Sequence, residues 1–290
     1  MESPILLSGQ VTLVPGQKAE VNDSSRLQNP FRTPMFIDEI RFRIADALPD
    51  AFDARAQFQV ELFLGRAPLT NGLVPFGNFS KLIQTGATDL ESFTWKLPKP
   101  LFVPPNEYVI ARVKNQVIFG PEVTQTVVVA YAGRSLRTGY PTPDVLHMPW
   151  AANFNIPAVL SGSPPVSNLS TEVDLVNPFN EPMFVQRFIG RGFSDLVLGG
   201  DPLHEFDAAT SRFTTVRAVD SFGQIMVRDP TPFTNLFFYG DRSWTVNTWL
   251  RPKGFYLFQV DQDYSTISTP GGIRQGANIS MLGYREVRLK

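Results

Sequence analysis

Residues 29–36 read NPFRTPMF and residues 177–184 read NPFNEPMF, so six of eight positions are identical. The shared residues are Asn29, Pro30, Phe31, Pro34, Met35 and Phe36 in the first segment, and Asn177, Pro178, Phe179, Pro182, Met183 and Phe184 in the second. The two segments are 148 residues apart, which is close to half of the 290-residue chain. This separation predicts two copies of one domain.

Further matches follow in the same order along the two halves. Pro104 and Tyr108 in LFVPPNEYVIARV match Pro252 and Tyr256 in WLRPKGFYLFQV, again 148 residues apart. Other matches are Phe76-Gly77 with Phe222-Gly223, Trp95 with Trp244, and Gly133 with Gly283, at separations of 146, 149 and 150 residues. A common turn sequence explains one match but not a collinear series, so we interpret the chain as a tandem duplication.

Alternating hydrophobicity predicts β-strands in both halves. In residues 56–64 (AQFQVELFL) every second side chain is apolar, and residues 39–44 show the same period of two. Residues 124–132 form an apolar, β-branched run that is typical of a strand buried on both faces. The second half has similar patterns at residues 213–219, 235–239, 244–250, 255–260 and 279–287. Helical patterns are limited to short turns within 46–56 and 195–209.

The strands number about seven or eight in each half and are joined by long connections. An immunoglobulin-like sandwich and an eight-stranded jelly roll both fit this count, and a repeat of about 140 residues favours the jelly roll. We therefore predict an all-β chain of two tandem jelly-roll β-sandwich domains. The predicted divisions are a first domain at 1–140, a Pro-rich connector at 141–167 and a second domain at 168–290.

The composition excludes several classes of protein. The chain has no Cys, which excludes disulfides, zinc–thiolate sites and Cys nucleophiles. Its two His, His147 and His204, are not at matching repeat positions, so we expect loop or surface residues and no metal site. A net charge of −1 argues against direct sequence-specific binding of nucleic acid. The first residues lack a basic start and a long apolar run, so we expect no signal peptide.

The sequence has no recognisable catalytic or phosphate-binding motif, so we expect no enzyme activity and no cofactor. Because Trp95 and Trp244 match each other, we expect a core role for both. Two other functions stay open. A carbohydrate-binding or glycan-processing tandem sandwich is one, because paired carboxylates cannot be recognised without a structure. A phage spike or decoration protein is the other, since it would share the β content.

The repeated NPF segments, the P-x-x-x-Y repeat before the VIARV and LFQV strands, and the length together resemble the double-jelly-roll major capsid proteins. These proteins build the shells of tailless icosahedral viruses, including membrane-containing bacteriophages. The resemblance covers nearly the whole chain and rests on architecture. It implies that three copies form a trimer with a pseudo-hexameric outline, and that such trimers tile the shell.

The same resemblance implies the partners of the chain. These are its own copies, neighbouring capsomers, minor capsid or penton proteins, and an internal lipid membrane where the virion has one. It also implies a location in the virion, after synthesis in the host cytoplasm.

Overall fold

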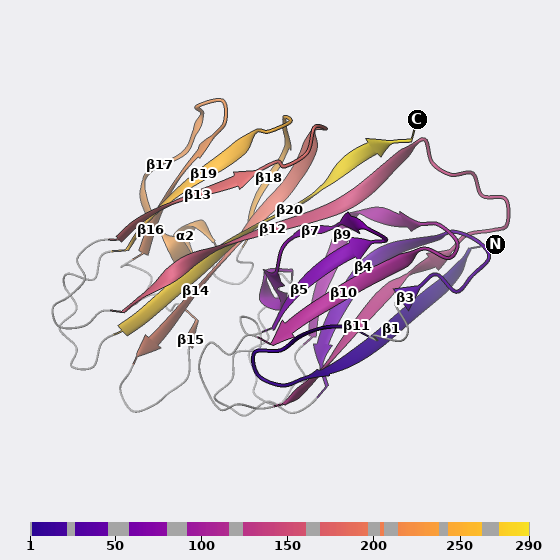
Figure 1. Cartoon of the computed structure of the whole chain (residues 1–290). Coiled ribbons are helices and arrows are strands. Elements are labelled where there is room, and N and C mark those ends of the chain that lie inside the picture. Colours follow the sequence, from indigo (N-terminus) through magenta and orange to yellow (C-terminus); the bar gives the residue numbers. More distant parts are fainter. Residues whose placement is uncertain are drawn as a thin grey trace. The chain divides into compact units, whose positions relative to one another are not determined.

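The structure is a computed structural model that describes residues 2–21, 27–45, 58–79, 92–115, 124–160, 169–196, 204–205, 214–237, 243–262 and 273–289. Most of these residues lie in β-strands (Figure 1). The helical elements among them are two short turns, η1 (Phe76–Asn78) and α2 (Phe233–Leu236). Within the same residues, no helix has the length and apolar character needed to cross a membrane.

The chain divides into two compact units. Unit 1 holds the described residues up to 152 together with residues 282–289, and unit 2 holds the described residues between 153 and 281. Strands β12 (Val145–Leu160) and β20 (Ile273–Arg288) contribute residues to both units.

The first half of the chain forms two antiparallel sheets. One has the order β1 (Ser3–Leu13), β11 (Gln125–Ser135), β4 (Met35–Ile44), β9 (Ser92–Val103). The other has the order β2 (Lys18–Glu20), β10 (Tyr108–Asn115), β5 (Phe58–Leu64), β6 (Ala67–Pro68). Two further short strands extend it, β3 (Leu27–Gln28) on β10 and β8 (Val74–Pro75) on β5.

The second half repeats the order of the main strands. Strands β12, β20, β14 (Met183–Leu196) and β18 (Ser243–Leu250) are neighbours in that order. Strands β13 (Leu169–Val176), β19 (Phe255–Gln262), β16 (Thr214–Asp220) and β17 (Ile225–Pro232) form the other sheet. Two short strands, β15 (His204–Glu205) and β7 (Thr70–Asn71), pair with β14 and β12 respectively. Two four-stranded orders that recur in each half define a jelly roll, so the predicted tandem jelly-roll fold is confirmed.

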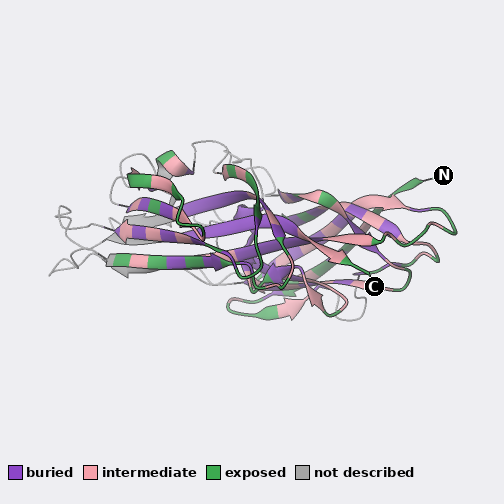
Figure 2. Cartoon of the chain, turned by 90° about the horizontal axis from the view of Figure 1, so that it is seen from above, coloured by how far each residue is buried: buried purple, intermediate pink, exposed green. Residues whose placement is uncertain are grey.

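Aromatic side chains fill the cores between the paired sheets. The ring of Phe42 on β4 stacks on Phe76 at 4.8 Å and lies 5.1 Å from Phe79, which in turn lies 4.9 Å from Trp95. In the second half Phe188 on β14 contacts Phe258 at 5.0 Å. Figure 2 shows that buried residues concentrate along the central parts of the strands. Ten phenylalanines among the described residues are buried, so the two cores account for much of the high Phe content.

The structure differs from the prediction in three places. The predicted connector contains the 16-residue strand β12. Residues 235–236, at the start of the predicted 235–239 strand, belong to α2. Strand β11 buries every second residue along most of its length, so it is not buried on both faces. The predicted turn at 46–56 lies outside the described residues. Of the predicted turn region 195–209, the described residues 195–196 and 204–205 belong to β14 and β15.

Candidate functional site

The first NPF segment forms a tight corner between β3 and β4, here named corner 1 (residues 29–34 with the facing turn 104–107). The Asn29 side chain is fully buried there. Its Nδ2 lies within donating distance of the carbonyl oxygens of Thr33 (3.0 Å), Val103 (3.3 Å) and Pro104 (3.1 Å). Its Oδ1 accepts a hydrogen bond from the Phe31 N–H at 3.0 Å. One side chain thereby satisfies backbone groups from two segments.

The second NPF segment forms an equivalent corner 2 (residues 177–182 with the facing turn 251–254). Asn177 is also fully buried. Its Nδ2 lies 2.9 Å, 3.4 Å and 3.1 Å from the carbonyl oxygens of Glu181, Leu250 and Arg251. The Phe179 N–H donates to its Oδ1 at 3.0 Å. The same four contacts therefore hold both corners.

The facing turns of the two corners also match. The Asn29 N–H donates to the carbonyl of Glu107 at 2.9 Å, and the Asn177 N–H donates to that of Gly254 at 2.8 Å. Asn106 and Lys253, one residue earlier in each turn, have positive φ angles of 63° and 59°. A positive φ at the third position, after a Pro at the second, is typical of a type II turn.

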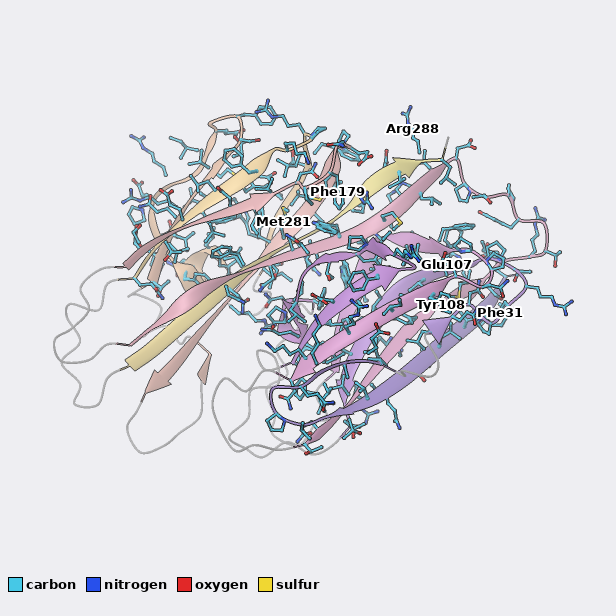
Figure 3. All side chains as sticks on the ribbon, viewed as in Figure 1. Phe31, Glu107, Tyr108, Phe179, Met281 and Arg288 are labelled. Atoms are coloured by element: carbon cyan, nitrogen blue, oxygen red, sulfur yellow. The ribbon has the colours of Figure 1, made fainter. Side chains whose placement is uncertain are left out.

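These turns correct the predicted P-x-x-x-Y alignment by one residue. Pro105, and not Pro104, occupies the position of Pro252, because each precedes the residue with positive φ. Tyr108 pairs with Gln28 in β3, whereas Tyr256 pairs with Leu175 in β13. The two tyrosines thus point to opposite faces of equivalent strands. Tyr108 is half-buried, and Figure 3 shows it with Phe31 and Glu107 at the same end of unit 1.

Tyr256 faces the interior of unit 2. Its side chain is 2% exposed, and its ring packs edge-on against Phe188 at 4.9 Å. Burial, and then the nearby Asp220 carboxylate, raise the pKa of Tyr256 to about 12. In unit 1, burial alone raises the pKa of Tyr131.

The other residues of the two NPF segments are placed in pairs. Met35 and Met183 are fully buried, Phe31 and Phe179 are half-buried, and Pro30 and Pro178 are exposed. Phe36 makes an edge-to-face contact with Phe102 at 5.6 Å, and Phe184 makes the same contact with Trp249 at 5.4 Å. Pro34 is half-buried, whereas its counterpart Pro182 is exposed. The repeat therefore specifies local structure in both halves.

The strand register confirms the match of Trp95 with Trp244. Trp95 pairs with Ile40, and Trp244 pairs with Phe188, which is 148 residues after Ile40. A bulge follows at the same place in both strand pairs. Trp95 is fully buried as predicted, but Trp244 is only half-buried.

The match of Phe76-Gly77 with Phe222-Gly223 is wrong. Phe76 is fully buried in η1, whereas Phe222 is 66% exposed in the turn between β16 and β17. The true counterpart of Phe76 is Phe233, since Pro75 and Pro232 precede them and pair with equivalent positions of β5 and β16. A P-F-x-N repeat at 75–78 and 232–235, separated by 157 residues, was the sequence signal for this match.

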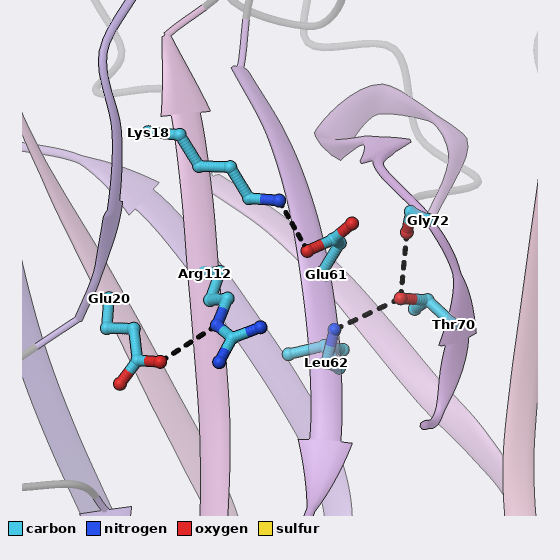
Figure 4. A network of polar contacts seen from close by, with 7 residues as sticks. All are labelled: Lys18, Glu20, Glu61, Leu62, Thr70, Gly72 and Arg112. Atoms are coloured by element: carbon cyan, nitrogen blue, oxygen red, sulfur yellow. Dashed lines mark hydrogen bonds and ion pairs between the residues drawn. The ribbon is translucent and has the colours of Figure 1, made fainter. Parts of the chain in front are cut away.

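Charged side chains cross the outer face of the second sheet of unit 1. Figure 4 shows Lys18 paired with Glu61 at 2.6 Å, and Arg112 paired with Glu20 at 2.8 Å. In the same view Thr70 Oγ1 accepts from the Leu62 N–H at 3.1 Å and donates to the Gly72 carbonyl at 2.9 Å. The two ion pairs join β2, β10 and β5 on this face, and the buried Thr70 links β7 to β5.

The two histidines lie on strands and not in loops. His147 on β12 has its Nε2 3.5 Å from Glu286 Oε1, and its ring lies edge-on to Tyr284 at 5.4 Å. His204 belongs to β15. Among the described residues, no three His, Asp or Glu side chains come together as a metal site would require.

The fold was compared with those of known proteins. No protein-family model matches the chain, and no curated protein matches it in sequence. A chain of the PBCV-1 virus capsid is similar in structure, with a TM-score of 0.52 at 10% identity, over 99% of this chain and 95% of that one. A chain from Sulfolobus Turreted Icosahedral Virus has a TM-score of 0.52 at 12% identity, over 96% and 90%.

A third similar structure is the major capsid protein P2 of bacteriophage PM2, with a TM-score of 0.48 at 10% identity over 98% of both chains. The two structures with the higher TM-scores carry the comparison. With the strand order described above, they show that this chain has the double-jelly-roll fold found in viral capsid proteins.

Proposed function

We propose that this chain is a major capsid protein that self-assembles as trimers into an icosahedral shell. The observation that carries the proposal is the repeat of one eight-stranded order in both halves, over 95% of the length of a PBCV-1 capsid chain. Two similar domains in one chain give six similar domains in a trimer, so a trimer acquires a nearly sixfold outline from threefold symmetry. Such a unit can tile a surface with six neighbours.

The proposed partners are further copies of the chain, minor capsid or penton proteins, and an internal membrane where the virion contains one. The proposed location is the virion, after synthesis in the host cytoplasm. The proposed role is structural and needs no enzyme activity or cofactor. The paired corners support a structural role, because the sequence repeat places a buried asparagine in each, and both asparagines form their hydrogen bonds with backbone groups.

Native mass spectrometry of the purified chain, followed by electron microscopy, tests the proposal. We expect a mass of three chains and particles with six lobes. A chain that stays monomeric at all concentrations and salt conditions would contradict the proposal. Monomers that bind oligosaccharides on a glycan array would favour the carbohydrate-binding alternative.

A further inference from the structure

A short strand covers the outer edge of β12. Thr70 and Asn71 of β7 pair in parallel with Ala151 and Ala152 of β12. The Ala151 N–H donates to the Leu69 carbonyl at 3.1 Å. These residues all belong to unit 1, and Figure 1 shows β7 beside β12. We call this β7–β12 pairing the bridge. Since β20 lies along the other edge of β12, the bridge gives β12 a partner on both sides.

Strand β12 is the counterpart of β1, because both are the first strands of equivalent sheets. The register between β12 and β20 follows from three contacts that lie opposite each other. These are Leu289 N–H to Asp144 carbonyl (3.0 Å), His147 to Glu286 (3.5 Å) and Ser280 to Asn153 (2.7 Å).

This register places Gly283 opposite Trp150. Gly133, which the sequence repeat predicts as the counterpart of Gly283, pairs with Ile5 in β1. Ile5 therefore corresponds to Trp150, and the next residues, Leu6 and Leu7, correspond to Ala151 and Ala152. The same alignment superposes Pro4 on Pro149, which is an independent agreement of residue type.

The counterpart of β7 lies in β17. Four pairings fix the alignment. Phe63 pairs with Pro68 and Val219 with Ile225 at one end, and Gln59 pairs with Pro75 and Thr215 with Pro232 at the other. Ile225 and Pro232 each lie 157 residues after their counterparts, Pro68 and Pro75. Thr70 and Asn71 therefore correspond to Val227 and Arg228. Leu69, which accepts the hydrogen bond from Ala151, corresponds to Met226.

Both of these equivalent edges lack a strand partner within the described part of the chain. There β1 pairs only with β11, and β17 pairs only with β16. Leu6 is 61% exposed, whereas its counterpart Ala151 is fully buried under the bridge. The 11 residues of β1 include no charged side chain, although charges are a usual device for preventing association of a long edge strand. Within the described residues the β1 edge is therefore open to a further strand.

We propose that β17 of one copy pairs in parallel with β1 of a second copy, with Val227 opposite Leu6 and Arg228 opposite Leu7. In this seam the Leu6 N–H donates to the Met226 carbonyl, as Ala151 does to Leu69 within one chain. The inference rests on the proposed self-assembly and gives it a residue-level contact. The contact joins two different surfaces, so each copy binds the next one head to tail. The copies form a closed ring when the rotation between neighbours brings the last copy back to the first.

Because the chain has no cysteine, designed cysteines report the seam directly. The Leu6→Cys and Val227→Cys variants are mixed and oxidised, and we expect a disulfide-linked heterodimer. The double variant is expected to give covalent dimers and trimers on a non-reducing gel. A matched control, Leu6→Cys with Glu172→Cys, places the second thiol on an exposed residue of β13 and should give no such ladder.

A second variant tests the seam without cross-linking. Leu6→Lys adds a charge to an exposed side chain, so the melting temperature of the monomer should not change. The charge should weaken association, so that trimers need a protein concentration more than tenfold higher to persist. Thr12 is exposed on the same strand but lies outside the proposed seam. The Thr12→Lys variant should therefore assemble like the parent chain.

The outcomes separate the seam from the proposed function. A parent chain that never forms trimers would overturn the proposed self-assembly. Parent trimers that survive Leu6→Lys and give no Leu6–Val227 disulfide would overturn the seam alone. Disulfides formed only between two Leu6→Cys chains would mean that β1 pairs with β1, which also overturns it.

Discussion

Corner 1 and corner 2 keep the same hydrogen bonds, while the surfaces beside them have diverged. Asn29 and Asn177 are both fully buried and make the same four contacts. Beside them Phe102 is 3% exposed, but its counterpart Trp249 is 45% exposed. In unit 1 the ring of Tyr140 lies 6.0 Å from Phe36 and adds cover on this side.

The difference shows which contacts a duplicated fold must retain. A buried carbonyl without a partner costs about 1–3 kcal/mol, and two segments depend on each asparagine. An exposed aromatic ring has no such fixed cost and can change with the partner that it meets. The corners are therefore retained as a unit, and the outer surfaces differ between the halves.

The two cores are packed differently, and the difference at one position is matched by a side chain from another. Gly190 on β14 takes the position of Phe42 on β4, 148 residues earlier. A Cβ at Gly190 would collide with the ring of Phe237, whereas Phe42 itself stacks on Phe76. A ring that one half supplies from its sheet is therefore supplied in the other half from the segment after α2.

The largest expected effect separates the two tryptophans. Trp95→Ala removes a fully buried ring from the first core, and we expect a loss of about 3–5 kcal/mol in the free energy of unfolding. Trp244→Ala should cost about 1–2 kcal/mol, because Trp244 is half-buried. Urea unfolding followed by circular dichroism measures both. Equal losses would mean that the two rings have equivalent roles despite their different burial.

The next effect tests whether the two corners are equivalent. Asn29→Ala and Asn177→Ala each remove the buried amide, and we expect each to cost about 2–4 kcal/mol in the same unfolding assay. Asn→Asp at either site keeps the acceptor for the Phe31 or Phe179 N–H but cannot donate to the carbonyls, so it should not restore stability. A full rescue by Asp would show that the carbonyl contacts contribute nothing.

The corners were predictable from the sequence, and β12 was not. Each corner depends on the hydrogen bonds of one buried asparagine, and the sequence around it is alike in both copies, which reveals the separation of 148 residues. Strand β12 contains two prolines and is buried through residues 148–152, so it has neither a strand-like composition nor an alternating pattern.

The register of β12 explains why its first proline is tolerated. The N–H of Ala151 points to β7 and away from β20, and residue 149 has the same orientation two positions earlier. Pro149 therefore removes no hydrogen bond between β12 and β20, as expected for proline on the free side of a strand. Sequence alone cannot show this, because it depends on which edge faces the neighbouring strand.

A smaller, pH-dependent effect distinguishes the equivalent positions Val109 and Tyr256. The pKa of Tyr256 is raised to about 12 in the folded chain, against an ordinary value near 10. Above pH 10 the unfolded chain releases this proton and the folded chain does not, so stability falls as the pH rises from about 10 to about 12. Tyr256→Phe should weaken this fall, as measured by thermal unfolding across that range. An unchanged alkaline slope would assign the effect to other groups, among them the buried Tyr131.

The smallest expected effect concerns the charged row on the outer face of unit 1. Arg112 lies between Glu20 and Glu61 in the strand register, and its counterpart in unit 2, Gln259, lies between Glu172 and Arg217. Arg112→Gln gives the row in unit 1 the same neutral residue at its centre that the row in unit 2 has. Because the Arg112 side chain is 42% exposed, we expect a loss of less than about 1 kcal/mol.

Salt dependence identifies the origin of that small loss. Screening weakens an exposed ion pair, so the difference between the parent chain and Arg112→Gln should shrink as NaCl rises from 0.05 M to about 1 M. A loss that persists at high salt would instead come from the packing of the Arg112 guanidinium over the Phe63 ring, 4.9 Å away. Arg112→Lys keeps the charge but not the planar contact, and so separates these two causes. A near-neutral result in both variants would place the charged row among the surface features that the two halves were free to change.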